Sequence, residues 1–399
     1  MNTYNEIHTP AFSDFEFLRP SAVSYLPHSM ECGSRWETYG SSSGWTSDLT
    51  RSAGGEYFER KHFYLDVPVH ATGTLSSTLN SEETTAFVNA LVQTSSHLPS
   101  EEIHSHAFDL TNAYRISDFT PCKIPTACVS ISPCRNPIDN QIYPMRDTCG
   151  CSAHTHLESA ILGALKEALE RQFLLRFWLT SKHATITEYN SACQILSKSK
   201  ALPLLQKLHD SGKLCMIDIS DSRFPGTCLL VCYGNPYDSA AKVKYCAGMA
   251  YTSNFCMALE KSIIELWQTF RFMLSLGATY PNQIKDPYLK HFIECNHYKT
   301  YETITTNLLP PSTASIRSEN EQLTARTLID DIRATKLDGF LYLTSMPTKQ
   351  STLYFCKYVS PNTFLHMNNS FALNTDNLYS GHFSREIIPS RLATMVPFP

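Results

Sequence analysis

The stretch LESAILGALKEALERQFLLRFW, at residues 157–178, is the most informative part of the chain for its fold. Apolar side chains recur in it at three- and four-residue spacing, which places them on one face of a helix. Glu167, Glu170 and Arg171 form the pattern E-x-x-E-R, and side chains three and four positions apart project from the same helix face. The stretch therefore predicts a long amphipathic helix that presents two carboxylates and a guanidinium side by side.

The pattern E-x-x-E-R occurs a second time about 110 residues earlier, at Glu56, Glu59 and Arg60. A third expected helix carries Glu265 and Gln268 in the related pattern E-x-x-Q. On any one helix, such a pattern is typical of a solvent-exposed face whose salt bridges are worth only about a few tenths of a kcal/mol. The alternative is that the three helices converge, in which case their carboxylates repel one another unless cations neutralise them.

Convergence would create a nucleotide site of a particular kind. Hard cations such as Mg2+ take carboxylate oxygens and usually share them with substrate phosphates. Arg60 and Arg171 would then donate forked hydrogen bonds to phosphate. The chain contains no G-x-x-x-x-G-K-[ST] sequence, so a nucleotide site between these helices would lack a P-loop.

The rest of the chain mixes expected strands and helices, which indicates an α/β (α+β mixed) enzyme. Residues 1–45 are rich in Ser, Thr, Gly and aromatic residues and are expected to be irregular, and residues 46–399 are expected to form one catalytic domain. Pro310 and Pro311 mark residues 305–320 as a surface insertion or linker. Short apolar or β-branched runs predict strands at residues 124–132, 214–219, 227–233, 340–344 and 353–359, and amphipathic runs predict further helices at residues 52–64 and 257–272.

Composition and charge exclude several classes of protein. The 399 residues are 42% hydrophobic and 18% charged, which excludes global disorder. The net charge of -4 argues against a general nucleic-acid binder. No apolar run approaches the roughly 18 residues that a membrane span needs, and the first residues show no secretory signal, so we expect a cytoplasmic protein. The 14 scattered cysteines include no C-x-x-C pair and are expected to stay reduced.

Three of the stretches resemble, in order and spacing, the motifs of the YcaO-domain family. SAGGEYFER at residues 52–60 resembles S-x-x-x-E-x-x-E-R, and GCSAH at residues 150–154, with the helix after it, resembles the second ATP motif. ALEKSIIELWQ at residues 258–268 resembles the helix A-L-x-x-A-x-x-E-x-x-Q. The similarity runs from about residue 50 to the last residue, and it includes YPMRDTCGCS from Tyr143, FLHMNNS from Phe364 and the terminal MVPFP.

The resemblance implies a YcaO-type fold of interleaved subdomains, with the ATP site between helices and with ATP and Mg2+ as cofactors. It implies an ATP-dependent cyclodehydratase that converts Cys, Ser or Thr of a ribosomal precursor peptide to thiazoline or oxazoline. ADP and phosphate are the by-products, and the product is an azole-modified, microcin-like peptide antibiotic. Alternatives are a YcaO-type enzyme that forms thioamides or amidines, and a non-catalytic nucleotide-binding scaffold.

The resemblance also implies partners and places the chain in a bacterial cytoplasm. A leader-binding subunit related to ubiquitin-activating folds and an FMN-dependent dehydrogenase subunit would complete a hetero-oligomeric synthetase. Nothing in this chain itself resembles a dinucleotide-binding fold, because it lacks the glycine fingerprint of such folds.

Individual residues receive roles from the resemblance. The implied Mg2+ ligands are Glu56, Glu59, Glu167 and Glu170. Many relatives have two consecutive acids before the alanine at the start of the second helix, whereas this chain has Glu158 followed by a serine. One expected acid is therefore missing. The further implied nucleotide-binding residues are Ser52, Arg60, Arg171, Glu265 and Gln268.

The last residues form a candidate catalytic tail, residues 395–399. They keep two prolines of the P-x-P-x-P ending that many family cyclodehydratases share. Because proline fixes φ, Pro397 and Pro399 favour an extended shape. The resemblance implies that Pro397 and the terminal carboxylate of Pro399 position or deprotonate the attacking side chain. The alternative is a frayed tail.

Two polar clusters stand outside these motifs. Cys149, Cys151, His154 and His156 have ligand types that suit zinc, but their spacing is unusual and favours a packed loop. Residues 366–370, HMNNS, are either a site loop or a buried hydrogen-bonded turn.

Overall fold

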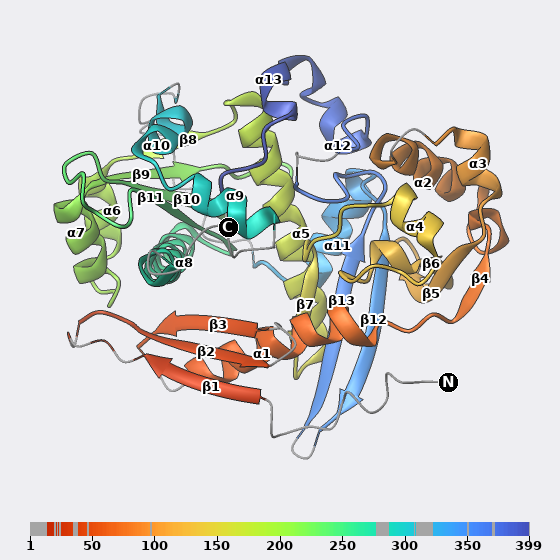
Figure 1. The fold of residues 1–399 in the computed structure, drawn as a ribbon, viewed down its shortest axis with the longest axis horizontal. Helices are drawn as coiled ribbons and strands as arrows, with labels where there is room; N and C mark the ends of the chain where they lie inside the picture. Colours follow the sequence, from red (N-terminus) through yellow and green to blue (C-terminus); the bar gives the residue numbers. More distant parts are fainter. Residues whose placement is uncertain are drawn as a thin grey trace.

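The structure is a computed structural model that describes residues 14–19, 21, 23, 25–34, 39–45, 48–95, 98–276, 287–306, 308, 322–348, 351–368 and 372–398. In this part of the chain the strands form three antiparallel sheets, with helices between and around them (Figure 1). The prediction of a mixed α/β fold is confirmed.

The three sheets come from different parts of the chain. One has the order β1 (Asp14–Arg19), β2 (His28–Ser34), β3 (Tyr39–Gly44). The second has the order β11 (Tyr245–Thr252), β10 (Thr227–Gly234), β9 (Lys213–Asp218), β8 (Thr185–Thr187). The third has the order β4 (Ala71–Gly73), β5 (Phe108–Arg115), β12 (Phe340–Pro347), β13 (Thr352–Val359), β7 (Cys151–His154), with β6 (Pro121–Pro125) paired to β5.

The third sheet joins strands that are far apart in the sequence. β12 pairs with β5, and β13 pairs with β7, so a late hairpin is inserted among earlier strands. The residues of the second sheet lie between these two parts of the chain. The third sheet is therefore assembled from two separate parts of the chain.

Helix α5 (Leu157–Thr180) runs through the middle of the molecule, between the second and third sheets (Figure 1). One hydrophobic cluster joins its buried residues, such as Leu169 and Phe173, to Ile217 of the second sheet and Leu341 of the third. The helix ends where Ser181 takes a left-handed φ of 52°, a common way to stop a helix. The predicted helix is confirmed, and its core position fixes the orientation of its polar face.

Two glycines let the other two acidic helices approach the sheets closely. α8 (Phe255–Leu276) packs on β10 and β11, and a Cβ at Gly248 would lie 2.0 Å from the backbone nitrogen of Leu266. α1 (Leu49–Lys61) packs on β3, and a Cβ at Gly40 would lie 2.2 Å from the carbonyl oxygen of Ala53. Only glycine fits at such backbone contacts. The contacts bring α1 and α8 toward α5.

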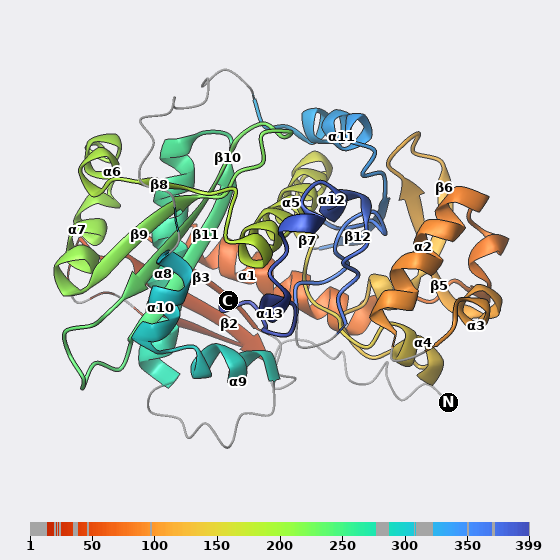
Figure 2. The same cartoon turned by 90° about the horizontal axis from the view of Figure 1, so that it is seen from above.

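The remaining helices lie outside this centre. Figure 2 shows α2, α3 and α4 together beside β5 and β6. None of the described helices combines the length and apolar character that a membrane span requires. The remaining helices are α2 (Ser81–Thr94), α3 (Ser100–Ser105), α4 (Pro137–Ile142), α6 (Tyr189–Ile195), α7 (Leu202–Ser211), α9 (Pro287–Glu294), α10 (Tyr298–Thr305), α11 (Ala325–Ala334), α12 (Leu378–Gly381) and α13 (Pro389–Leu392).

Several sequence-based expectations are wrong in detail. Residues 1–45 are not irregular throughout, because they contribute β1, β2 and β3. The strand expected at residues 124–132 stops at Pro125 and gives way to a 3-10 turn. The first acidic helix ends at Lys61, and a π-helical turn follows at His62–Asp66. The insertion expected at residues 305–320 stays a prediction, because it falls almost entirely outside the described residues.

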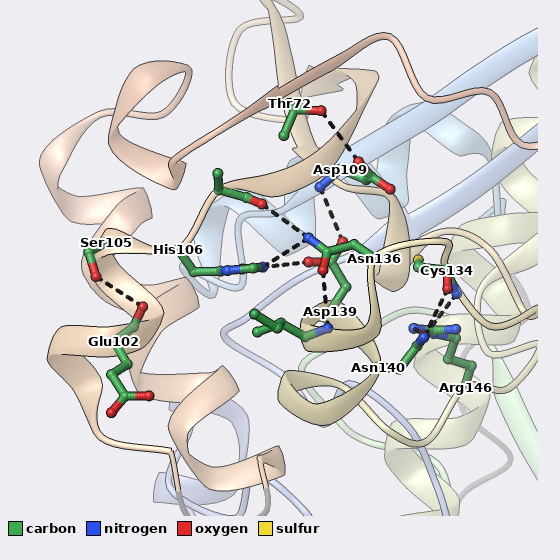
Figure 3. Close-up of polar contacts among 12 residues, drawn as sticks. Thr72, Glu102, Ser105, His106, Asp109, Cys134, Asn136, Asp139, Asn140 and Arg146 are labelled. Carbon is green, nitrogen blue, oxygen red and sulfur yellow. Dashed lines mark hydrogen bonds and ion pairs between the residues drawn. The ribbon is translucent and has the colours of Figure 1, made fainter.

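A buried carboxylate holds the α3–α4 region together (Figure 3). Asp139 of α4 is fully buried, and its Oδ1 lies 2.6 Å from Nε2 of His106, which follows α3. Its Oδ2 accepts the backbone N–H of Asp109 in β5 at 3.1 Å. Burial raises the pKa of Asp139, and the hydrogen bonds from His106 and Asp109 oppose that shift. The carboxylate thus joins α3, α4 and β5.

Replacing His106 with Ala is expected to lower the free energy of unfolding by about 1–3 kcal/mol, because the buried Asp139 carboxylate loses a partner. Urea denaturation measures the loss. His104→Ala is the matched control, since His104 lies on α3 with its side chain exposed. Equal stability of the two variants would show that the Asp139 contact contributes nothing.

Candidate functional site

A cavity of about 720 Å³ lies where α1, α5 and α8 meet β3, β10 and β11. The helices that form it stand around the centre of the molecule in both views (Figures 1 and 2). Five glutamates and four basic side chains line it, together with serines and the inner residues of β11. The nine residues predicted to bind nucleotide all line this cavity: Ser52, Glu56, Glu59, Arg60, Glu167, Glu170, Arg171, Glu265 and Gln268.

Hydrogen bonds through β3 tie α1 to α8 at the cavity wall. The backbone N–H of Ser41 donates to Glu56 Oε2 at 2.9 Å. Gln268 Nε2 of α8 donates to the hydroxyl of the same serine at 2.7 Å. Arg60 Nη2 lies 3.4 Å from Glu56 Oε1 on the other side of the carboxylate. Ser41 therefore links the first E-x-x-E-R motif to the E-x-x-Q motif.

The second E-x-x-E-R motif faces the first from α5. Glu167 lies 4.0 Å from Arg171 one helical turn later, and Glu170 accepts the backbone N–H of Tyr251 at 2.8 Å. Desolvation raises the pKa of Glu167 well above its usual value, and the neighbouring Glu59 adds to the shift. Desolvation likewise raises the pKa of Glu170, while Arg171 opposes it. These carboxylates are therefore costly to hold ionised without added positive charge.

Glu59 and Glu265 show the same excess of negative charge. Desolvation raises the pKa of Glu59 to about 7, although Arg60 and the backbone N–H of Ala153 oppose the shift. Desolvation raises the pKa of Glu265 to about 7, and Glu56 adds to it, even though this side chain is open to the cavity. The Nε of Arg60 is buried and has no hydrogen-bond partner among the described residues. The carboxylates of the cavity therefore lack sufficient neighbouring positive charge, and the Nε–H of Arg60 lacks a hydrogen-bond acceptor among the described residues.

Three serines and two lysines of the wall were not among the residues predicted from the sequence. Ser41, Ser42 and Ser43 belong to β3, which lacks the apolar alternation that marks a strand. Lys166 and Lys261 each precede a predicted glutamate by four positions, so the helical repeat alone placed them on the same face. Desolvation lowers the pKa of Lys166. The positive charge of Lys261 lowers it further, as expected for two lysines that line the same cavity.

The donors of the cavity fit Mg2+ bound together with phosphate. Carboxylate oxygens are hard ligands, and Mg2+ usually takes one or two of them and completes its octahedron with waters and substrate phosphates. In the part of the chain that the structure describes, no three His, Cys, Asp or Glu side chains are grouped tightly enough to hold one ion by themselves. A cation here would therefore need oxygen ligands beyond these carboxylates, such as those of phosphate and water.

The zinc interpretation of residues 149–156 gains no support. Cys151 is buried, whereas His154 and His156 are exposed. The cysteine and the two histidines therefore lie in different environments. Desolvation raises the pKa of Cys149 and of Cys151 well above the usual value, which keeps both thiols protonated. Protonated thiols are poor metal ligands and poor nucleophiles.

Residues 366–368 are buried and do not line the cavity. The Nε2 of His366 donates to the carbonyl of Ala372 at 3.1 Å, and its Nδ1 accepts the N–H of Asn368 at 3.2 Å. Asn369 and Ser370, which complete the motif, lie outside the described residues.

The end of the described chain packs against the cavity. Met395, Val396 and Phe398 are buried, and Phe398 lines the cavity. The carbonyl of Pro397 accepts a hydrogen bond from the hydroxyl of Tyr245 at 2.8 Å. Residues 395–398 are therefore packed, not frayed, whereas Pro399 lies outside the described residues.

Comparisons with known proteins point to one family. The sequence profile of the YcaO cyclodehydratases, described as binding ATP and Mg2+, matches residues 50–363. The chain is 32% identical over 365 residues to the microcin B17-processing protein McbD of Escherichia coli, which covers 91% of this chain and 90% of that protein.

Solved structures agree with this result. A chain of the E. coli microcin synthetase McbBCD complex matches with a TM-score of 0.89 at 30% identity, over 98% of both chains, as does the same complex with pro-MccB17 bound. YcaO from Methanopyrus kandleri bound with AMPPCP and Mg2+ matches with a TM-score of 0.57 at 12% identity, over 88% of this chain and 85% of that one. This last likeness shows a shared fold alone.

Proposed function

The chain belongs to the YcaO cyclodehydratase family, and on that premise we propose that it is the ATP-dependent cyclodehydratase subunit of an azole-forming peptide synthetase. The observation that carries the proposal is that both E-x-x-E-R motifs and Phe398 line one cavity. A nucleotide site and the predicted catalytic tail would then share one space. The substrate would be a ribosomally made precursor peptide, and the product a microcin-like antibiotic.

The polar residues of the cavity divide into two groups under this proposal. Glu56, Glu59, Glu167 and Glu170 would hold Mg2+, since the raised pKa values of Glu59, Glu167 and Glu170 indicate a site that is short of positive charge. The second group would bind the nucleotide and its phosphates: Ser52, Arg60, Lys166, Arg171, Lys261, Glu265 and Gln268. When bound, Mg-ATP supplies the phosphoryl group that makes an amide oxygen a good leaving group.

The reaction closes a five-membered ring in the peptide. The thiol or hydroxyl of Cys, Ser or Thr loses its proton and attacks the preceding backbone carbonyl carbon. The former carbonyl oxygen leaves as phosphate, and the amide nitrogen loses its proton as the C=N bond forms. Residues 395–399 would position the peptide or accept the first proton, with Pro397 and the carboxylate of Pro399 in the roles that the resemblance implies.

The relatives also indicate partner subunits. The similar E. coli chain is part of a McbBCD complex that has been seen with pro-MccB17 bound. We infer a hetero-oligomeric synthetase with a leader-binding subunit and an FMN-dependent dehydrogenase. All 14 cysteines are free thiols, which suits the proposed bacterial cytoplasm.

Phosphate release tests the proposal against its alternatives. The full-length chain with its partner subunits should release phosphate only when the precursor peptide is present, and the peptide should lose the mass of one water per ring. Phosphate release with a sulfur donor and without loss of water would favour thioamide formation. Nucleotide binding without any phosphate release would indicate a scaffold.

Magnesium binding is expected to strengthen as the pH rises from about 6 to about 8. The folded-state pKa of Glu59 is about 7, above the usual value of 4.5, so the folded metal-free chain holds a proton that the unfolded chain has released. Metal-free stability therefore falls as the pH rises between these values, and a cation that replaces the proton gains affinity. Melting temperatures with and without MgCl2 at the two pH values measure the effect. The same Mg2+-induced increase at both would contradict it, and Glu59→Gln should weaken the pH dependence.

A further inference from the structure

The segment that leads to the cavity, residues 388–398, is held by hydrogen bonds along its length. The N–H of Ile388 donates to the carbonyl of Leu179 at 2.9 Å. The Nη1 of Arg391 donates to the carbonyl of Trp178 at 2.6 Å, and its guanidinium lies 4.4 Å from the centre of the indole ring. The segment is thus attached to the end of α5, the same helix that carries the second E-x-x-E-R motif.

Two further contacts fix the segment closer to the cavity. The Nε1 of Trp178 donates to the carbonyl of Thr394 at 3.1 Å, and the hydroxyl of Tyr245 donates to the carbonyl of Pro397 at 2.8 Å. The ring of Trp178 also meets Phe398 edge to face, with centroids 6.2 Å apart. Contacts at positions 391, 394 and 397 recur every three residues, so the segment cannot slide without breaking all of them.

Both donors are themselves fixed. Tyr245 is 1% exposed and begins β11, the strand whose later residues line the cavity. Trp178 is 4% exposed and lies two turns beyond Arg171 on α5. The segment is therefore buried and hydrogen-bonded to the core of the molecule up to the cavity wall.

We propose that Tyr245 and Trp178 are positioning residues for the ring-forming step, because they set how far residues 395–398 reach into the cavity. The inference rests on the proposed function for the reaction that it affects. Neither residue belongs to the nucleotide motifs, and Tyr245 and Trp178 do not line the cavity. Their effect is therefore on the placement of the tail and not on the binding of Mg-ATP.

The first experiment compares Tyr245→Phe with Tyr233→Phe. Tyr233 lies in the neighbouring strand β10, is 1% exposed, and donates its hydroxyl to the carbonyl of Ser211 at 3.2 Å, away from the tail. Each variant is assembled as the full chain with its partner subunits and precursor. Tyr245→Phe should lower kcat for water loss from the precursor by on the order of 10- to 100-fold, with an unchanged KM for ATP, because small misplacements at a reacting centre are costly. Tyr233→Phe should match the wild type.

The second experiment tests whether Tyr245 acts through the tail. In a chain that lacks residues 397–399, Tyr245→Phe should cause no further loss, because the carbonyl that it holds is gone. In the chain of full length, Trp178→Phe, which keeps an aromatic ring but removes the N–H donor to Thr394, should lower the rate as Tyr245→Phe does. A rate loss in Tyr245→Phe that persists in the shortened chain, or that Tyr233→Phe shares, would overturn the proposal.

Amide hydrogen exchange at residues 394–398 gives a readout that is independent of activity. Tyr245→Phe should speed exchange there and leave exchange in α8 unchanged. Unchanged exchange at the tail would overturn the proposal, even if the rate fell. An inactive wild-type complex would instead refute the proposed function, and the exchange result would still decide whether Tyr245 holds the tail.

Discussion

Replacing Glu170 with Gln is expected to reduce ATP turnover and ring formation by on the order of 10²–10³-fold, the loss typical of removing one preorganised electrostatic group from an active site. The side chain keeps its size, and its amide oxygen can still accept the N–H of Tyr251, which Glu170 binds at 2.8 Å. Only the charge is lost. Precursor-dependent phosphate release and the mass of the peptide measure the effect, and Glu59→Gln should behave in the same way.

Stability separates this effect from misfolding. Glu170 and Glu59 both have raised pKa values because they are desolvated in one crowded cavity. Removing one of these charges relieves that cost, so the melting temperature of the metal-free variant should be equal to that of the wild type or higher. Glu260→Gln is the matched control, since Glu260 lies on α8 but does not line the cavity. Normal turnover in Glu170→Gln would refute its assignment to Mg-ATP.

The convergence of the three acidic helices was predictable only with the family resemblance, because the spacing of the acids alone left solvent-exposed helix faces as the alternative. Carboxylates at i and i+3 on one helix face need partners, and a repeated motif on separate helices suggests that they share those partners. The structure brings all nine predicted residues to one cavity. The long helix was predictable from its apolar side chains, which recur at helical spacing. The structure buries these side chains between two sheets.

Residues 39–44, YGSSSG, show why part of the wall was missed. They form β3, yet they contain no apolar alternation, because Gly40 meets α1 and the three serines that follow it line the cavity. A strand recruited to bind ligand can resemble a loop in its composition. The position of β3 in the cavity wall becomes clear only from its packing against α1 in the structure.

The strand expected at residues 124–132 illustrates the opposite error. The run IPTACVSIS is apolar, and residues 124–130 are buried, so its hydrophobicity was interpreted correctly. Burial does not specify backbone conformation in a short apolar run, and here the chain turns after Pro125. The pairing of β12 with β5 was equally inaccessible, because register between strands more than 200 positions apart depends on the whole fold.

The tail lies between these cases. Its prolines and the family resemblance predicted a place near the active site, and the structure packs Phe398 into the cavity wall. What the sequence did not reveal is how the segment is held there. Hydrogen bonds from Trp178 and Tyr245 to backbone carbonyls depend on side chains more than 150 positions away, and they leave no local pattern.

Deleting Pro397–Pro399 is expected to lower the rate of ring formation by about 10²–10⁴-fold, the contribution of a general base. Binding of Mg-ATP should change little, because the predicted nucleotide ligands lie on α1, α5 and α8. The mass of the precursor and the affinity for a non-hydrolysable ATP analogue measure the two effects separately. The deletion also removes Phe398, which is 2% exposed against Trp178, so some loss of stability accompanies it.

Adding one Gly after Pro399 avoids that complication and makes the sharper test. It keeps Phe398, both prolines and a terminal carboxylate, but moves that carboxylate by roughly 3.5 Å. A shift of this size is large for a positioned base, so ring formation should fall steeply while the melting temperature and the affinity for nucleotide stay at wild-type values. An added Gly directly after Thr348, between β12 and β13 and far along the chain from the tail, controls for insertion itself. If the extended chain removes water from the precursor at the wild-type rate, the carboxylate takes no part in the reaction, and the tail acts only through the packing of residues 395–398.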